Sequence, residues 1–212
     1  MILNFIFSNL NTITLGIWII FSLIIMVRFF RPAWVKNISY KKLLIYVIAL
    51  KIVQFLFITW GQYYVWSSST DFTRTLLDLP LSKEVPMPFL MEWLRPIMFE
   101  NNLGYFLYYV WGRFWLYVFI LFLLSLVVYI LLRIWRDFRG GFSKDGPLLI
   151  LILSLISGWP GVLVFIPLGF ILAVLHLAIA YIRGKKNTEI ELVFLFACFV
   201  ALVFGDKILG LL

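Results

Sequence analysis

Charged residues are scarce in this chain: Asp, Glu, Lys and Arg make up 13% of its 212 residues, whereas hydrophobic residues make up 64%. Soluble domains are about half apolar and about a quarter charged, so this composition excludes an ordinary soluble domain. It is typical of an integral membrane protein, whose expected partner is the lipid bilayer. The net charge is +8, but the basic residues lie at the ends of apolar runs, where they indicate membrane topology and not nucleic-acid binding.

Residues that bind metals or form disulfides are rarer still. The chain has one cysteine and one histidine. Cys198 lies in an apolar run, which excludes a disulfide and a thiolate zinc site within one chain. The sequence contains no phosphate-binding loop, metal-ligand cluster or Ser-His pair, so we expect neither a cofactor nor a metal.

Long apolar runs, in contrast, fill most of the sequence and predict an all-α, polytopic membrane protein that forms a single domain over residues 1–212. A spanning helix needs about 20 apolar residues. About six transmembrane helices are expected, at residues 12–30, 43–66, 103–132, 147–157, 161–182 and 192–212. The fourth and fifth are separated because Gly158-Trp159-Pro160-Gly161 break what would otherwise be one overlong helix. Residues 147–157 are short, and they either cross the membrane or form a re-entrant segment.

The loops between these runs alternate in charge, and this alternation predicts the topology. Residues 28–42 hold five Lys or Arg and no acid, and residues 133–146 and 183–191 also carry basic residues. Residues 67–102 hold three basic residues and five acids. Because basic loops stay in the cytoplasm, we expect the N-terminus, the C-terminus and the loop 67–102 outside. Within that loop, residues 89–95 form either a short interfacial helix or an ordinary packed loop.

An acid at the mouth of a predicted span is the strongest candidate for a functional residue. Asp145 ends a basic loop directly before Gly146 and Pro147, and a carboxylate near hydrocarbon costs free energy. One interpretation is a catalytic acid. The other is a helix N-cap, whose oxygen accepts backbone N–H bonds. Lys144 favours the cap, because a neighbouring ammonium group keeps a carboxylate ionised.

The order of motifs from residue 140 onward resembles a known family. A glycine-bearing loop ends in Asp145, and the segments that follow are Gly158-Trp159-Pro160-Gly161, a basic turn at 183–186, Thr188-Glu189-Ile190 and Phe204-Gly205-Asp206. This order is similar to the C-terminal half of type IV prepilin peptidases, which are intramembrane aspartyl proteases of the Gly-x-Gly-Asp class. The resemblance implies a helical membrane scaffold, Asp145 as a catalytic aspartate, and prepilin-like or other membrane proteins as partners.

The same comparison shows departures from the family pattern. Both glycines of Gly-x-Gly-Asp are out of register, because Phe142-Ser143-Lys144 precede the acid. Aspartyl proteolysis needs two carboxylates that share a proton. In the family the second aspartate lies in the cytoplasmic loop two spans earlier, which is here the acid-free segment 28–42. Other acids are either predicted across the membrane or lie outside the family's position: Asp71, Asp78, Asp137, Glu189 and Glu191.

Three polar side chains lie inside predicted spans: Lys51, Arg113 and His176. A central Arg costs about 2.5–3.5 kcal/mol on insertion scales, so we expect Arg113 to face the bundle interior and to pair with Glu100 or Asp206. Lys51 either snorkels toward water or reaches toward Asp145. His176 is either a hydrogen-bonded interior residue or part of a proton relay.

Three functions follow from these observations, each in the inner or plasma membrane of a prokaryote. The first is a prepilin-peptidase-like scaffold that is non-catalytic or divergent and serves pilus or secretion assembly by binding. The second is an active intramembrane aspartyl protease with a relocated partner acid. The third is a small transporter or membrane-complex subunit unrelated to proteases, with Arg113 and Lys51 as interior polar groups. The missing acid in residues 28–42 favours the first function over the second.

Overall fold

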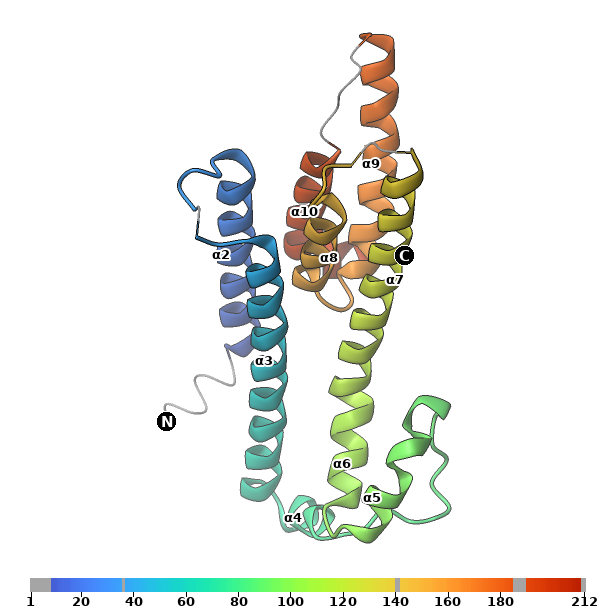
Figure 1. Ribbon diagram of the computed structural model, residues 1–212. Helices are drawn as coiled ribbons and strands as arrows, with labels where there is room; N and C mark the ends of the chain where they lie inside the picture. The colour runs from blue at the N-terminus through green and yellow to red at the C-terminus, as the bar shows by residue number, and fades with distance from the viewer. Residues whose placement is uncertain (1–8, 36, 140–141, 185–189, 211–212) are drawn as a thin grey trace. The chain divides into compact units, whose positions relative to one another are not determined.

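The computed structural model describes residues 9–35, 37–139, 142–184 and 190–210, apart from the side chains at positions 11, 90, 139 and 206. Helices are the only regular elements in these ranges (Figure 1). Four helical stretches are long and apolar enough to cross a membrane: Thr12–Phe30, Tyr40–Ser68, Gly104–Phe138 and Val162–Ile182. The protein is therefore an all-helical membrane protein.

Two further apolar helices are shorter. α8 (Gly146–Ser157) has 12 residues, and the apolar part of α10 (Glu191–Leu209) ends at Gly205. At 1.5 Å per residue, α8 rises about 18 Å, which is less than the roughly 30 Å of hydrocarbon in a bilayer. Four of the six predicted spans therefore have a helix of spanning length. The other two spans, and the position of both termini outside, remain predictions.

The chain divides into two compact units, each of which is described by itself. The first unit comprises Met1–Leu50 and Leu121–Leu212, and the second comprises Lys51–Ile120. A single domain over residues 1–212 stays a prediction.

The short helix α8 forms the centre of the first unit's core. Nearly every residue from Gly146 to Ser157 is buried, and Ile150, Ile152 and Leu153 are 0% exposed. α8 packs against α2 (Leu10–Phe30) and α10, and α9 (Val162–Ile182) packs along α10. Figure 1 shows α8 and α10 at the centre of this unit. Because protein side chains enclose α8, a helix too short to cross the bilayer is sheltered from lipid.

Glycines set the helix end and one close helix contact in this unit. Gly158 follows α8 with φ of 68°, a conformation that L side chains rarely adopt. The chain then turns, and α9 begins at Val162, so the break expected at residues 158–161 is present. On α9, a Cβ at Gly169 would lie 2.6 Å from the ring of Phe194 on α10. The two helices therefore pack at a separation that only glycine permits there.

Aromatic side chains build the core of the second unit. α3 (Tyr40–Ser68), α4 (Asp71–Leu77) and α6 (Gly104–Val110) contribute to a cluster around Trp66. The Trp66 ring lies 5.5 Å from the Phe106 ring and 4.9 Å from the Tyr109 ring, measured between centroids. Further along, the π-helical turn η2 (Trp111–Trp115) places the Trp115 indole N–H 3.0 Å from Thr59 Oγ1, to which it donates a hydrogen bond.

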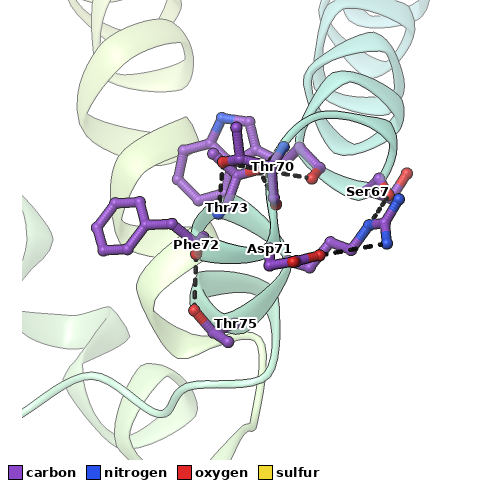
Figure 2. Close-up of polar contacts among 8 residues, drawn as sticks. Ser67, Thr70, Asp71, Phe72, Thr73 and Thr75 are labelled. Atoms are coloured by element: carbon purple, nitrogen blue, oxygen red, sulfur yellow. Dashed lines mark hydrogen bonds and ion pairs between the residues drawn. The ribbon is translucent and has the colours of Figure 1, made fainter.

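The segment 67–102 contains three short helices, α4, η1 (Phe89–Leu94) and α5 (Arg95–Glu100). α4 begins at a capping box, in which the hydroxyls of Thr70 and Thr73 each accept a hydrogen bond from the other residue's backbone N–H (Figure 2). The Thr73 hydroxyl also donates to the Trp66 carbonyl at 2.9 Å, and Arg74 Nε donates to the Ser67 carbonyl at 2.8 Å. These bonds satisfy backbone groups at the end of α3 and the start of α4.

Candidate functional site

The loop that leads into α8 is held from two sides of the first unit. Arg136, on α7 (Leu116–Arg139), donates a hydrogen bond from Nη1 to the Lys144 carbonyl at 2.7 Å. Glu191, the first residue of α10, accepts a hydrogen bond at Oε1 from the Ser143 N–H, also at 2.7 Å. Hydrogen bonds with a charged partner are stronger than neutral ones. Two charged side chains therefore fix the backbone directly before Asp145.

The Glu191 side chain is an internal anchor. Glu191 is only 3% exposed, and a buried carboxylate needs hydrogen-bond partners. Its Oε1 lies against Gly146, where any Cβ would collide with it. An acid also suits the positive end of a helix dipole. Glu191 thus joins the start of α10 to the start of α8.

Asp145, the expected catalytic or capping acid, is exposed. It occupies the cap position of α8, and its carbonyl accepts a hydrogen bond from the Leu149 N–H at 2.9 Å. Its side chain, however, makes no capping hydrogen bond, so the interpretation of Asp145 as a side-chain cap is wrong for this structure. Among the side chains that the structure describes, Asp145 also has no ion pair.

A guanidinium and a phenol lie at the same end of the first unit. The Arg28 guanidinium lies 5.7 Å from the centroid of the Tyr40 ring. Tyr40 interacts electrostatically with Arg28, Asp145 and Glu191. We refer to these four residues, which come from α2, α3, the loop and α10, as the Glu191 cluster.

The charges of the Glu191 cluster differ from those of an aspartyl dyad. In a dyad two carboxylates share one proton, because like charges about 3 Å apart cannot both ionise. Here the cluster also contains the guanidinium of Arg28. One carboxylate oxygen of Glu191 is also bonded to the loop backbone. The arrangement is suited to holding the loop, and it leaves the Asp145 side chain exposed.

The three intramembrane candidates occupy different environments. Lys51 on α3 is buried, with 4% of its surface exposed. Its side chain therefore does not extend to water as that of a snorkelling lysine would. Arg113 lies in η2 and is exposed, so the expectation that it faces the interior is wrong. Of its expected partners, Glu100 is exposed and the side chain of Asp206 lies outside the described residues. His176 is half-buried on α9 and lines a cavity.

The other acids that were considered as partners of Asp145 are found elsewhere. Asp137 is bonded to its chain neighbour Arg136 at 2.6 Å. Asp71 is the first residue of α4 and Asp78 follows its last, both in the second unit. Glu189 lies outside the described residues. Within the described part of the first unit, Glu191 is the acid that reaches the Asp145 loop.

The structural roles of Glu191, Arg28 and Tyr40 were missed from sequence. Glu191 was set aside because it does not occupy the family's position for the second acid. Two signals were available: an acid that begins an apolar helix, and Gly146 directly after Asp145, a small residue that leaves room for a buried side chain. Neither signal names the partner, because residues 143 and 191 are far apart in the chain.

Comparisons of the chain with protein-family models, with curated proteins and with solved structures find no match. The resemblance to type IV prepilin peptidases therefore stays a prediction that depends on the motifs between residues 140 and 206.

Proposed function

We propose that the protein is a non-catalytic membrane scaffold of the prepilin-peptidase kind, which serves pilus or secretion assembly in a prokaryotic inner or plasma membrane by binding another membrane protein. The observation that supports this proposal most is the use of Glu191. Its carboxylate binds the Ser143 N–H from a buried position, whereas Asp145 is exposed. Glu191 thus acts as a structural anchor, whereas Asp145 lies at the surface.

A cleavage assay with purified protein and prepilin-like peptides tests the absence of catalysis. The variants are wild type, Asp145→Ala and Glu191→Gln. We expect no cleavage above a blank without protein in any of the three. Cleavage by wild type that Asp145→Ala abolishes would overturn the proposal.

Stability measurements test the structural role of Glu191 separately. Glu191→Ala leaves the Ser143 N–H without its partner, and losing a hydrogen bond to a charged group costs about 1.5–3 kcal/mol. Asp145→Ala removes an exposed side chain, and such substitutions usually stay within about 0.5 kcal/mol. Reversible unfolding in mixed micelles compares the two variants with wild type. Equal destabilisation by both would contradict the assignment of Glu191 as the anchor.

Co-purification tests the binding role. A single-span prepilin-like protein is expressed together with the chain, and the chain is then purified. The prepilin-like protein should co-purify with wild type and with Asp145→Ala alike, because a scaffold does not need a catalytic acid. An unrelated single-span protein of the same length is the control. If the prepilin-like protein and the control co-purified equally, or if neither co-purified, the result would argue against a specific scaffold.

A second function, an active aspartyl protease that pairs Asp145 with Glu191, has one observation in its favour. Glu191 lies against Gly146, the residue next to Asp145, so a second carboxylate does reach this loop. That function requires cleavage by wild type and its loss in both Asp145→Ala and Glu191→Gln. The assay above separates it from the scaffold without further variants.

A further inference from the structure

A cavity of about 800 Å³ lies within the first unit, with walls from α2, α8, α9 and α10. Binding sites for small molecules are usually apolar pockets of about 300–1,000 Å³ with a few placed polar groups. The walls are apolar in this way, with residues such as Met26, Leu153 and Phe199. The size and the lining therefore match a site for one lipophilic molecule.

Two polar side chains line this cavity from different helices, Ser22 on α2 and His176 on α9. Ser22 is 9% exposed, and its buried hydroxyl has no hydrogen-bond partner among the described residues. A helical serine usually bonds back to a carbonyl of the preceding turn. Ser154 and Ser157 on α8 do so, at 2.8 and 2.7 Å. Ser125 on α7 also lacks a partner, but it is not among the residues that line the cavity.

His176 is the single histidine of the chain, and it is half-buried in an otherwise apolar wall. The described residues provide it with no hydrogen bond. A polar group in an apolar environment costs free energy unless it is bonded, and within a membrane span such a residue often marks a site. A neutral imidazole offers one donor and one acceptor, and a serine hydroxyl offers both as well.

The lining also limits what can bind. None of the residues that line the cavity is Asp, Glu, Lys or Arg, so a ligand with a full charge inside it would be unpaired, which is costly. Leu175 and Ile179 line the cavity and are 53% and 50% exposed on α9. In a membrane-spanning helix such exposed apolar side chains face lipid. A ligand therefore has a route into the cavity from the hydrocarbon.

We propose that this cavity binds a neutral, membrane-soluble molecule with an apolar chain and a carbonyl or hydroxyl oxygen at its head, placed to bond with His176 and Ser22. Quinones and neutral acyl esters share this chemistry. The inference goes beyond the proposed scaffold function and does not depend on it.

Native mass spectrometry of the full-length protein, released from nanodiscs that hold a known mole fraction of probe, tests this binding. The probes are a decyl-chain quinone, monoolein and hexadecane, and the added mass identifies which one is bound. We expect a one-to-one complex with one or both oxygen-bearing probes and none with hexadecane. The added mass also shows whether the protein prefers the quinone or the ester. Equal occupancy by hexadecane would overturn the proposal, because it would show that the cavity holds any apolar chain.

Substitutions locate the bound molecule. A hydrogen bond contributes about 0.5–1.5 kcal/mol, so His176→Leu should weaken the apparent affinity roughly 2- to 10-fold, and Ser22→Ala by a similar factor. His176→Gln keeps a hydrogen-bonding group and should restore most of the lost affinity. A loss that Gln does not restore, or no loss in either His176→Leu or Ser22→Ala, would contradict the assigned polar contacts.

Two adjacent positions on α9 supply a matched steric control. Leu175 lines the cavity, whereas its neighbour Val174 is 65% exposed and is not part of the lining. Leu175→Trp should therefore reduce occupancy, whereas Val174→Trp should leave it unchanged. Both variants place a large apolar side chain at an exposed position of the same helix, so any effect on folding should be similar in the two. Equal occupancy in the two variants would place the ligand elsewhere.

Discussion

The two units hold their helices together with different side chains. In the first unit the enclosed helix α8 is packed by aliphatic residues, and glycines let neighbouring helices approach closely. In the second unit Trp66 and its aromatic neighbours fill the core, and side chains of α4 cap the end of α3 and the start of α4. Close approach through small residues is a feature of helix packing inside membranes. Large aromatics and polar caps suit a region where helices end and the chain turns.

The comparison makes Trp66 the residue on which the second unit depends most. Trp66→Ala empties a space lined by Phe106 and Tyr109, and substitution of a buried Trp by Ala costs about 3–5 kcal/mol. Trp60→Ala on the same helix is the control, since Trp60 is 47% exposed. Reversible unfolding in mixed micelles measures both. If Trp60→Ala destabilised as much as Trp66→Ala, the aromatic core would not be what holds this unit.

Gly169 tests the corresponding claim for the first unit. In Gly169→Ala the new methyl group collides with the buried Phe194 ring, and overpacking of this kind costs about 1–3 kcal/mol. Gly16→Ala on α2 is the matched control, because no atom lies within 4 Å of the added Cβ. Ala in a helix interior is about 0.5–1 kcal/mol more favourable than Gly. The same unfolding assay should therefore show opposite signs for the two variants, and equal signs would refute close packing at Gly169.

The smallest effect is expected from a surface ion pair of the second unit. Arg95 donates hydrogen bonds from Nε and Nη2 to the two carboxylate oxygens of Glu92, at 2.6 and 2.7 Å. These hydrogen bonds hold the pKa of Glu92 below its ordinary value. The pair therefore stabilises the folded state above the ordinary carboxyl pKa, and this contribution is lost as the pH falls through the lowered one. Because exposed pairs are weak, we expect a small effect.

Unfolding of wild type and of Glu92→Gln, measured from pH 6 down to pH 3, isolates this contribution. The difference in stability between the two proteins should shrink as the pH falls. A difference that stays constant over this range would show that the ion pair is not its source. In the first unit, by contrast, the anchor is the hydrogen bond between Glu191 and the Ser143 N–H.

Much of the helical organisation could be predicted from the sequence. The runs at residues 12–30 and 161–182 closely match the spanning stretches Thr12–Phe30 and Val162–Ile182. The break between residues 157 and 161 was predicted from glycine and proline, which act locally. The predicted run 103–132 is longer in the structure, reaching Phe138, because charged residues near its end do not interrupt a helix. The helices of the segment 67–102 were predicted less well, since tertiary packing decides whether so short a helix forms.

The candidate site was predictable only as a location. The sequence marked the loop before Pro147 as unusual, but it named Asp145 as the functional or capping acid. In the structure Glu191 makes the bond to the loop backbone and Asp145 remains exposed. Arg113 was expected inside on the basis of its cost in a membrane, yet it is exposed. The functional role of Asp145 stays a prediction, but its expected side-chain cap is absent. The missing cap and the exposure of Arg113 both concern which partner a polar group finds, and that depends on residues distant in the chain.

By itself, the sequence determined that this is a helical membrane protein, where most of its long helices lie and where the chain breaks between them. Those properties follow from apolar composition and from the local effects of glycine and proline on the backbone. Only the tertiary structure decided that α8 is enclosed by protein, that Glu191 and not Asp145 binds the loop, and that Ser22 and His176 line one cavity. The physical reason is that burial and hydrogen bonding depend on how helices pack, which brings together residues that are far apart in the sequence.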